Sequence, residues 1–128
     1  MPIRTLTENG EHSWPAILTA EPLLVIYKHS PTCGVSSVTR PEVGALGDAM
    51  PSVPVYQVDV LRQRDLSEAV ANELGVGHES PQVILVCDGR AAWSASHFSI
   101  KAATVKVKIE RALEACALRR PSEAGTAG

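Results

Sequence analysis

Cysteine is scarce in this chain, and its scarcity excludes the simplest disulfide and metal sites. The 128 residues contain three cysteines, which is not the even set of a disulfide framework, and no two of them form a C-x-x-C pair. Because the three are dispersed, they also lack the paired ligand spacing of a zinc site. We therefore expect three free thiols, one of which is reactive.

Long apolar runs and an excess of charge are missing as well. The longest uncharged apolar run is far too short to span a bilayer, and the N-terminus lacks the basic-then-apolar order of a signal peptide. A formal net charge of −2 gives no reason to expect a nucleic-acid or membrane partner. These absences predict a cytoplasmic protein, and 45% hydrophobic content in 128 residues fits one globular domain with a single core.

What the sequence does contain is organised around residues 23–37. An apolar run rich in β-branched residues, 23–29, ends in Ser-Pro-Thr, and Cys33 stands where a new helical pattern begins. A cysteine in the first turn of a helix lies beside unsatisfied backbone N–H groups and the positive end of the helix dipole, which favour the thiolate. Cys33 is thus a candidate nucleophile for thiol–disulfide exchange, and burial as a small core residue is the alternative.

The first half of the chain predicts a helical extension followed by a β-α-β unit. Apolar spacing indicates a short helix that stops before Pro22. After the strand at 23–29 comes an apolar stripe that is interrupted by Pro41, which predicts either a bent helix or two short ones. The second strand of the unit is expected at 55–60.

The next helix has signals at both of its ends. Leucine and valine recur at helical spacing over residues 66–74. Asp65 and Glu68 are placed as in a capping box, and Gly75 is expected to stop the helix.

A hairpin and a final helix complete the pattern. Residues 82–87 form an apolar strand, Asp88-Gly89 is a two-residue turn signal, and residues 90–95 are expected to return antiparallel. The last helix is expected to begin near residue 99 or 100, and residues 119–128 lack apolar periodicity. We therefore expect a single domain over residues 1–118, followed by a disordered tail.

The resulting order is helix, β-α-β, helix, β-hairpin and helix. It predicts an α/β fold in which a mixed four-stranded sheet is covered by helices, with an N-terminal helical extension. In such sheets, chemistry collects at the carboxyl ends of the parallel strands, which is where Cys33 falls. The local pattern and the topology thus point to the same residue.

Four short motifs occur together between about Leu23 and Ile100. They are Lys28-His29-Ser30 before Cys33, His78-Glu79-Ser80-Pro81-Gln82, Asp88-Gly89, and Trp93-Ser94-Ala95-Ser96-His97. Each motif is weak alone, but the combination resembles the YtxJ-type monothiol bacilliredoxins of the thioredoxin and glutaredoxin superfamily.

This resemblance implies a thioredoxin-like fold and exchange with bacillithiol, a low-molecular-weight thiol used in place of glutathione. Cys33 takes the nucleophile position, Pro81 the cis-proline position, and Ser80 that of the residue whose backbone pairs with the bound thiol or peptide. Ser36 stands where dithiol members carry a second cysteine, and a serine forms no disulfide. The implied activity is a monothiol cycle that removes bacillithiol, or a similar thiol, from S-thiolated client proteins, with no metal or tightly bound cofactor.

Charged and basic side chains near Cys33 are further candidates for the site. His29 precedes Cys33 by four residues, close enough to stabilise the thiolate or hold an anionic thiol, and an exposed strand-end histidine is the alternative. Lys28 and Arg40 are candidates for meeting the carboxylates of a bacillithiol-like ligand, although such side chains are usually solvated.

The other two cysteines are not expected to resolve the intermediate. Cys87 lies six residues beyond Pro81, roughly 20 Å away at about 3.3 Å per residue, and is expected to be a core thiol. Cys116 lies on the apolar face of the last helix and is expected to be buried. His78 and His97 match the family pattern, but their spacing places them only near strand ends.

Two alternative functions remain open. The segment from Cys33 to Ser36, Cys-Gly-Val-Ser, is similar to the C-G-F-S signature of monothiol glutaredoxins, which hold an iron–sulfur cluster between two subunits, with Val35 in place of the aromatic residue. The other alternative is a thioredoxin-like binding or sensor module without turnover. No motif identifies the client proteins, the reducing partner or the oligomeric state.

Overall fold

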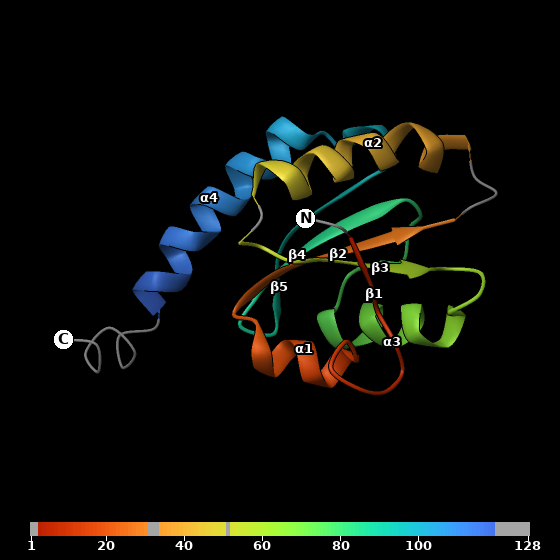
Figure 1. Ribbon diagram of the computed structural model, residues 1–128, viewed down its shortest axis with the longest axis horizontal. Helices are drawn as coiled ribbons and strands as arrows, with labels where there is room; N and C mark the ends of the chain where they lie inside the picture. The colour runs from red at the N-terminus through yellow and green to blue at the C-terminus, as the bar shows by residue number, and fades with distance from the viewer. Residues whose placement is uncertain (1–2, 31–33, 51, 120–128) are drawn as a thin grey trace.

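The computed structural model describes residues 3–30, 34–50 and 52–119, excluding the side chains of residues 34–38, 98 and 116–119. Figure 1 shows a central sheet with helices on both faces. The strands are β1 (Arg4–Thr5), β2 (Leu23–His29), β3 (Val55–Asp59), β4 (Gln82–Cys87) and β5 (Arg90–Ser96). The helices are α1 (Trp14–Ala20), α2 (Gly34–Ala49), α3 (Arg64–Leu74) and α4 (Ala102–Arg119), with a 3₁₀ turn at His97–Ser99.

The strands lie in the order β1-β3-β2-β4-β5. β1, β3 and β2 are parallel, whereas β4 runs antiparallel to β2 and β5 antiparallel to β4. The predicted α/β class with a mixed sheet is confirmed, but the predicted number of four strands is wrong. β1 pairs with Tyr56 and Gln57 over only two residues, too short a stretch to show an alternating pattern in the sequence.

Alternation along β2 divides its side chains between two cores. Leu23, Val25 and Tyr27 pack with α2 and α4, whereas Leu24 and Ile26 pack with α1 and α3 on the other face. Figure 1 shows these two helix pairs on opposite sides of the sheet. β2 is therefore covered on both faces, which explains its nearly continuous apolar sequence.

Two glycine-containing chain reversals form as predicted. Gly75 ends α3 in the left-handed conformation at φ 65°, and its N–H donates to the carbonyl of Ala71. Asp88 and Gly89, at φ 50° and 78°, form the turn between β4 and β5.

Three predicted helix details need comment, and two of them are wrong. α2 is one uninterrupted helix containing Pro41 rather than two short ones, because Pro41 is exposed and the apolar side chains of the helix keep their contact with the sheet, and the alternative of a bend at Pro41 stays a prediction. The residue that caps α3 is Gln63, which makes no side-chain cap bond, so Asp65 and Glu68 form no capping box. α4 begins at Ala102 because the preceding residues form the 3₁₀ turn.

The last helix, α4, continues as far as Arg119. Residues 120–128 lie outside the described ranges, so the predicted tail stays a prediction. Among the helices of the described ranges, none combines the length and hydrophobicity that crossing a bilayer requires.

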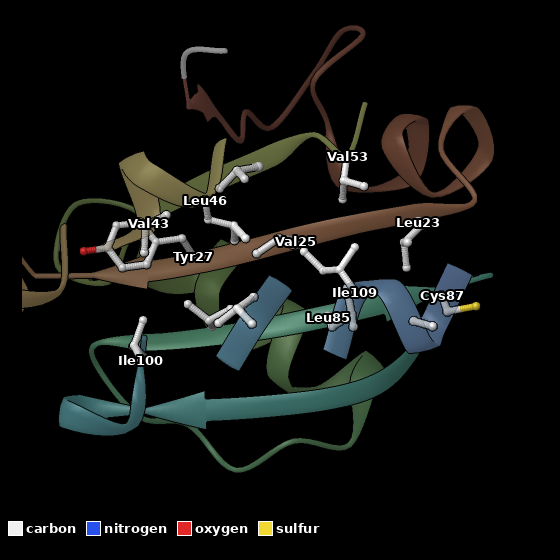
Figure 2. Packing of buried hydrophobic residues seen from close by; sticks show 14 residues of the cluster. Leu23, Val25, Tyr27, Val43, Leu46, Val53, Leu85, Cys87, Ile100 and Ile109 are labelled. Atoms are coloured by element: carbon white, nitrogen blue, oxygen red, sulfur yellow. The ribbon is translucent and has the colours of Figure 1, made fainter. Parts of the chain in front are cut away.

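Cys87 lies in the core beside α4, as predicted, but it is not a free thiol. Its side chain is 1% exposed, and its sulfur is disulfide-bonded. Figure 2 shows Cys87 at one end of this core, with Ile100 toward the other. The sulfur to which Cys87 is bonded is not among the described side chains. The side chains of Cys33 and Cys116 also lie outside the described set. Sequence spacing gave no sign of this bond because disulfide formation depends on distance in the folded chain.

Two glycines provide a matched test of these helices. Gly75→Ala is expected to lower the free energy of unfolding by about 1 kcal/mol, because alanine is strained at a φ of 65°. Gly44→Ala, inside α2, is expected to raise it by about 0.5–1 kcal/mol, because a Cβ there meets no atom within 4 Å and alanine favours the helix. Urea unfolding of both variants measures the difference, and equal effects of the same sign would contradict it.

Candidate functional site

At one edge of the sheet, where β2 and β3 end and β4 begins, lie His29, Ser80 and Pro81, the described residues among those predicted to form the site. β2 and β3 end side by side at His29 and Asp59, which are register partners. Antiparallel β4 begins at Gln82, opposite Lys28, so the Ser80–Pro81 segment enters the sheet at this same edge. α2 begins at Gly34, directly after Cys33 in the sequence.

Cys33 and the side chain of Ser36 fall outside what the structure describes, so their predicted contacts stay predictions. In the sequence, Cys33 stands between the end of β2 at His29 and the start of α2 at Gly34, and the segment before β4 enters the sheet beside the end of β2. A strand before the cysteine and a helix after it are what the sequence predicts for a reactive cysteine.

The Ser80–Pro81 peptide bond is cis, as the family resemblance implies. Pro81 is buried, and its carbonyl accepts a hydrogen bond of 3.0 Å from the backbone N–H of His97. The hydroxyl oxygen of Ser80 is buried and has no hydrogen-bond partner within the described part of the chain. Pro81 is thus fixed to the end of β5, on the side of β4 away from β2.

His29 lies on the α2 side of the sheet, half-buried against its neighbour on the strand. Its ring stacks on Tyr27 with centroids 5.5 Å apart and planes inclined by 22°. Burial lowers the pKa of His29, and the positive charge of Arg40 lowers it further, whereas the Asp59 carboxylate opposes the shift. The imidazole is therefore held as a neutral ring near pH 7.

A cavity of about 300 Å³ opens beside His29 at the β3 side of this edge. Its lining comes from β1, β2, β3 and the turn before α3: Thr5, His29, Gln57, Asp59, Arg62 and Gln63. The Asp59 carboxylate accepts hydrogen bonds from the backbone N–H groups of Leu61, at 2.9 Å, and Arg62, at 3.0 Å. Burial acts to raise the pKa of Asp59, but these bonds and the charges of His29 and Arg62 lower it overall.

Sequence reasoning found no role for this second part of the edge. The available signal was the position of Asp59 at the carboxyl end of a parallel strand, next to His29 in the register. Arg62 and Gln63 join it only because the chain turns back there: Gln63 accepts from the Asp59 N–H at 3.0 Å and donates to the Leu6 carbonyl at 2.7 Å.

Lys28 does not take the ligand-facing position that its sequence neighbourhood suggested. Its side chain is 0% exposed, and its Nζ lies 3.3 Å from Nδ1 of His78. Burial lowers the pKa of Lys28. Burial also lowers the pKa of His78, helped by the charges of Lys28 and Arg64 and opposed by Glu68. A buried lysine cannot meet the carboxylates of a ligand, so that predicted contact is wrong.

The remaining candidates lie apart from this buried pair. Arg40 is exposed on α2, and His97 is exposed at the end of β5. Within the described residues, no group of three or more His, Cys, Asp or Glu side chains could hold a metal ion.

Comparison with known proteins places this geometry in a family. A family profile described as monothiol bacilliredoxin BrxC matches residues 6–105. A solved structure described as a proposed oxidoreductase with a thioredoxin fold has a TM-score of 0.73 at 22% identity, over 83% of this chain and 92% of the other.

Two thioredoxins are similar in the same way. The thioredoxin of Fasciola hepatica has a TM-score of 0.63 at 24% identity, covering 85% of this chain and 98% of its own. Mitochondrial thioredoxin 3 of Saccharomyces cerevisiae has a TM-score of 0.65 at 22% identity, covering 85% and 94%. These similarities confirm the predicted thioredoxin-like fold.

The lowered histidine pKa values predict how stability depends on pH. Because the pKa values of His29 and His78 lie below the ordinary value of about 6.5, the unfolded chain binds more protons than the folded one just below that pH. The free energy of unfolding is therefore expected to fall as the pH drops from 7 to 5. His29→Gln should reduce this slope in denaturant titrations at each pH, and an unchanged slope would contradict the assigned shift.

The bonded state of Cys87 predicts the number of reactive thiols. Without reductant, iodoacetamide is expected to label one cysteine in the denatured chain, and after reduction it should label all three. We expect the single labelled residue to be Cys33. Cys87 lies opposite Leu23 at the start of β2, and the strand then runs for roughly 20 Å, at about 3.3 Å per residue, before it ends at His29, four residues ahead of Cys33 in the sequence. Peptide mapping by mass spectrometry identifies the residue, and label on Cys87 before reduction would contradict the assignment.

Proposed function

Since the chain belongs to the monothiol bacilliredoxin family, which consists of thiol oxidoreductases, we propose that it removes bacillithiol or a similar low-molecular-weight thiol from protein mixed disulfides. Cys33 is the nucleophile of this proposal. The clients are S-thiolated proteins, and bacillithiol acts as co-substrate rather than as a resident cofactor. The cytoplasm is the compartment that we propose for this exchange.

The observation that carries the proposal is the meeting of three elements at one edge. β2 ends four residues before Cys33 in the sequence, α2 begins directly after it, and the Ser80–Pro81 segment enters the sheet beside the carboxyl end of β2. The first-turn N–H groups of α2 and its dipole favour a thiolate at Cys33. The backbone of the Ser80–Pro81 segment offers an extended edge on which a bound thiol or peptide can pair.

The proposed cycle is two successive thiol–disulfide exchanges. The Cys33 thiolate attacks the bacillithiol sulfur of the mixed disulfide, a new S–S bond forms, and the client leaves as a thiolate that takes up a proton. A second thiol, or a reductase, then attacks the bacillithiol sulfur bound to Cys33 and releases Cys33 as thiolate. The second thiol supplies the electrons, because the first exchange only transfers the disulfide.

The neighbouring side chains are assigned supporting roles. Ser36 is proposed to donate a hydrogen bond from its hydroxyl to the Cys33 thiolate. It cannot form a disulfide with Cys33, which keeps the cycle monothiol. His29, whose pKa is lowered, is neutral near pH 7 and is proposed to donate a hydrogen bond to the bound thiol rather than to act as a cation. Pro81 and Ser80 are proposed to orient the mixed disulfide in line with Cys33.

Intact mass spectrometry tests the nucleophile directly. Wild-type protein and the Cys33→Ser variant are each mixed with a model protein that carries bacillithiol as a mixed disulfide. We expect wild type to gain the mass of one bacillithiol while reduced model protein appears in equal amount. The variant should gain none, because serine cannot take part in the exchange.

A parallel series replaces the bacillithiol of the substrate with glutathione, cysteine or coenzyme A. Faster transfer from the bacillithiol substrate than from the others would support bacillithiol as the co-substrate. Transfer from only one of the other thiols would identify that thiol as the co-substrate and would leave the proposed mechanism unchanged. If wild type gains no adduct from any of the four, the exchange activity is refuted.

A further inference from the structure

Lys28 occupies a core position that ordinary packing does not favour. Alternation along β2 places it on the same face as Leu24 and Ile26, which belong to the apolar core beneath α1 and α3. Its side chain is 0% exposed, and its Nζ has one hydrogen-bonding contact within the described residues, at 3.3 Å from His78 Nδ1. Burying an amine costs free energy unless it is well paired, so an apolar residue of similar length would be easier to accommodate.

Gln82 lies directly opposite Lys28 on β4 and is buried as well. The two residues are register partners, and Gln82 is 2% exposed. Its Nε2 donates to the carbonyl of Gly77 at 2.9 Å, while its Oε1 is buried without a partner in the described chain. Two polar side chains on adjacent strands therefore lie side by side in an otherwise apolar layer.

Both of these side chains bind the same short segment. Residues 75–80 connect α3 to Pro81, and most of them are exposed, His78 and Gly77 among them. Only Val76 packs against the core, and its N–H donates to the Ala71 carbonyl at 3.1 Å. The middle of the segment is thus held to the sheet by the contacts of Lys28 with His78 and of Gln82 with Gly77.

We propose that Lys28 and Gln82 are positioning residues that fix the 75–80 segment on the sheet and thereby set the place of Ser80 and Pro81 relative to the exchanging disulfide. This inference rests on the proposed thiol exchange. Neither residue touches the reacting sulfur atoms, and each acts through the segment that carries Ser80 and Pro81. Their expected effect is on substrate binding rather than on the reactivity of Cys33.

The contact between Lys28 and His78 depends on the charge of His78. Lys28 of β2 and Arg64 and Glu68 of α3 all act on this ring. Protonation of His78 would therefore place three positive charges beside one carboxylate. An ammonium group can only donate, so Nδ1 of His78 accepts from Lys28 only while it carries no proton. The segment is therefore held best with a neutral His78.

Lys28→Met separates positioning from simple stability. Methionine has a similar length and no polar group, so the variant is expected to be as stable as wild type or more stable in urea unfolding. KM for the S-bacillithiolated model protein is nevertheless expected to rise roughly tenfold with little change in kcat. Loss of the Lys28–His78 contact would leave Ser80 and Pro81 less well positioned to bind the substrate. The rate of Cys33 alkylation by iodoacetamide should not change.

Ile26→Leu is the matched control, because Ile26 lies on the same strand face as Lys28 and its side chain makes no hydrogen bond to the 75–80 segment. Its KM is expected to stay within twofold of wild type. A folded Lys28→Met variant whose KM also stays within twofold would overturn the proposal.

Variants of exposed His78 provide a second test that does not depend on the core. His78→Asn keeps an acceptor near the position of Nδ1 and should behave like wild type, whereas His78→Phe should raise KM as Lys28→Met does. The double variant Lys28→Met/His78→Phe should be no worse than either single one, because both remove the same contact. Equal KM values for His78→Asn and His78→Phe, or additive losses in the double variant, would contradict the proposed contact.

Amide hydrogen exchange measures, without any substrate, how firmly the 75–80 segment is fixed to the sheet. Exchange at residues 77–80 is expected to be at least tenfold faster in Lys28→Met than in Ile26→Leu. This comparison keeps the two proposals distinguishable. If wild type fails to transfer any thiol but the exchange rates differ in this way, the proposed function fails and the positioning role survives. If thiol transfer occurs and the exchange rates are equal, the positioning role fails alone.

Discussion

The antiparallel register between β2 and β4 is the constraint on which the rest of the structure depends. It pairs Lys28 with Gln82, and so brings the chain entering β4 beside the chain leaving β2. A shift of one residue would exchange the faces of every side chain on β4 and separate Gln82 from Lys28. Both strands bury side chains on both faces, so such a shift would displace close-packed side chains against α2 and α4 on one side and against α1 and α3 on the other.

The two ends of this sheet consequently differ in character. Toward Leu23 and Cys87 the strands continue the apolar core, and the only sulfur chemistry among the described residues there is a buried covalent bond. Toward Lys28 and Gln82 the core becomes polar, with side chains that hold loops rather than fill space. Apolar burial therefore stabilises one end of the sheet, whereas hydrogen bonds from buried polar side chains hold the chain at the other.

Features encoded by local chemistry could be predicted from the sequence, whereas those that depend on tertiary contacts could not. Gly75 and Asp88-Gly89 act through their own backbone conformations, so their turns were predicted correctly. The position of Lys28 was not, because a lysine near a strand end normally reaches water. Here β2 is a central strand with helices on both faces, and only the assembled layers show that the side chain has no route to solvent. The bond at Cys87 was missed for the same reason.

The burial of Lys28 also makes it an internal reporter. Acylating reagents that modify amines reach the exposed Lys101 and Lys106 on the outside of the molecule without any structural change. They reach Lys28 only after the structure around it opens, because its side chain is 0% exposed. The rate at which Lys28 is acylated therefore measures how often the structure around this amine opens, and the covalent adduct remains after the structure has closed again.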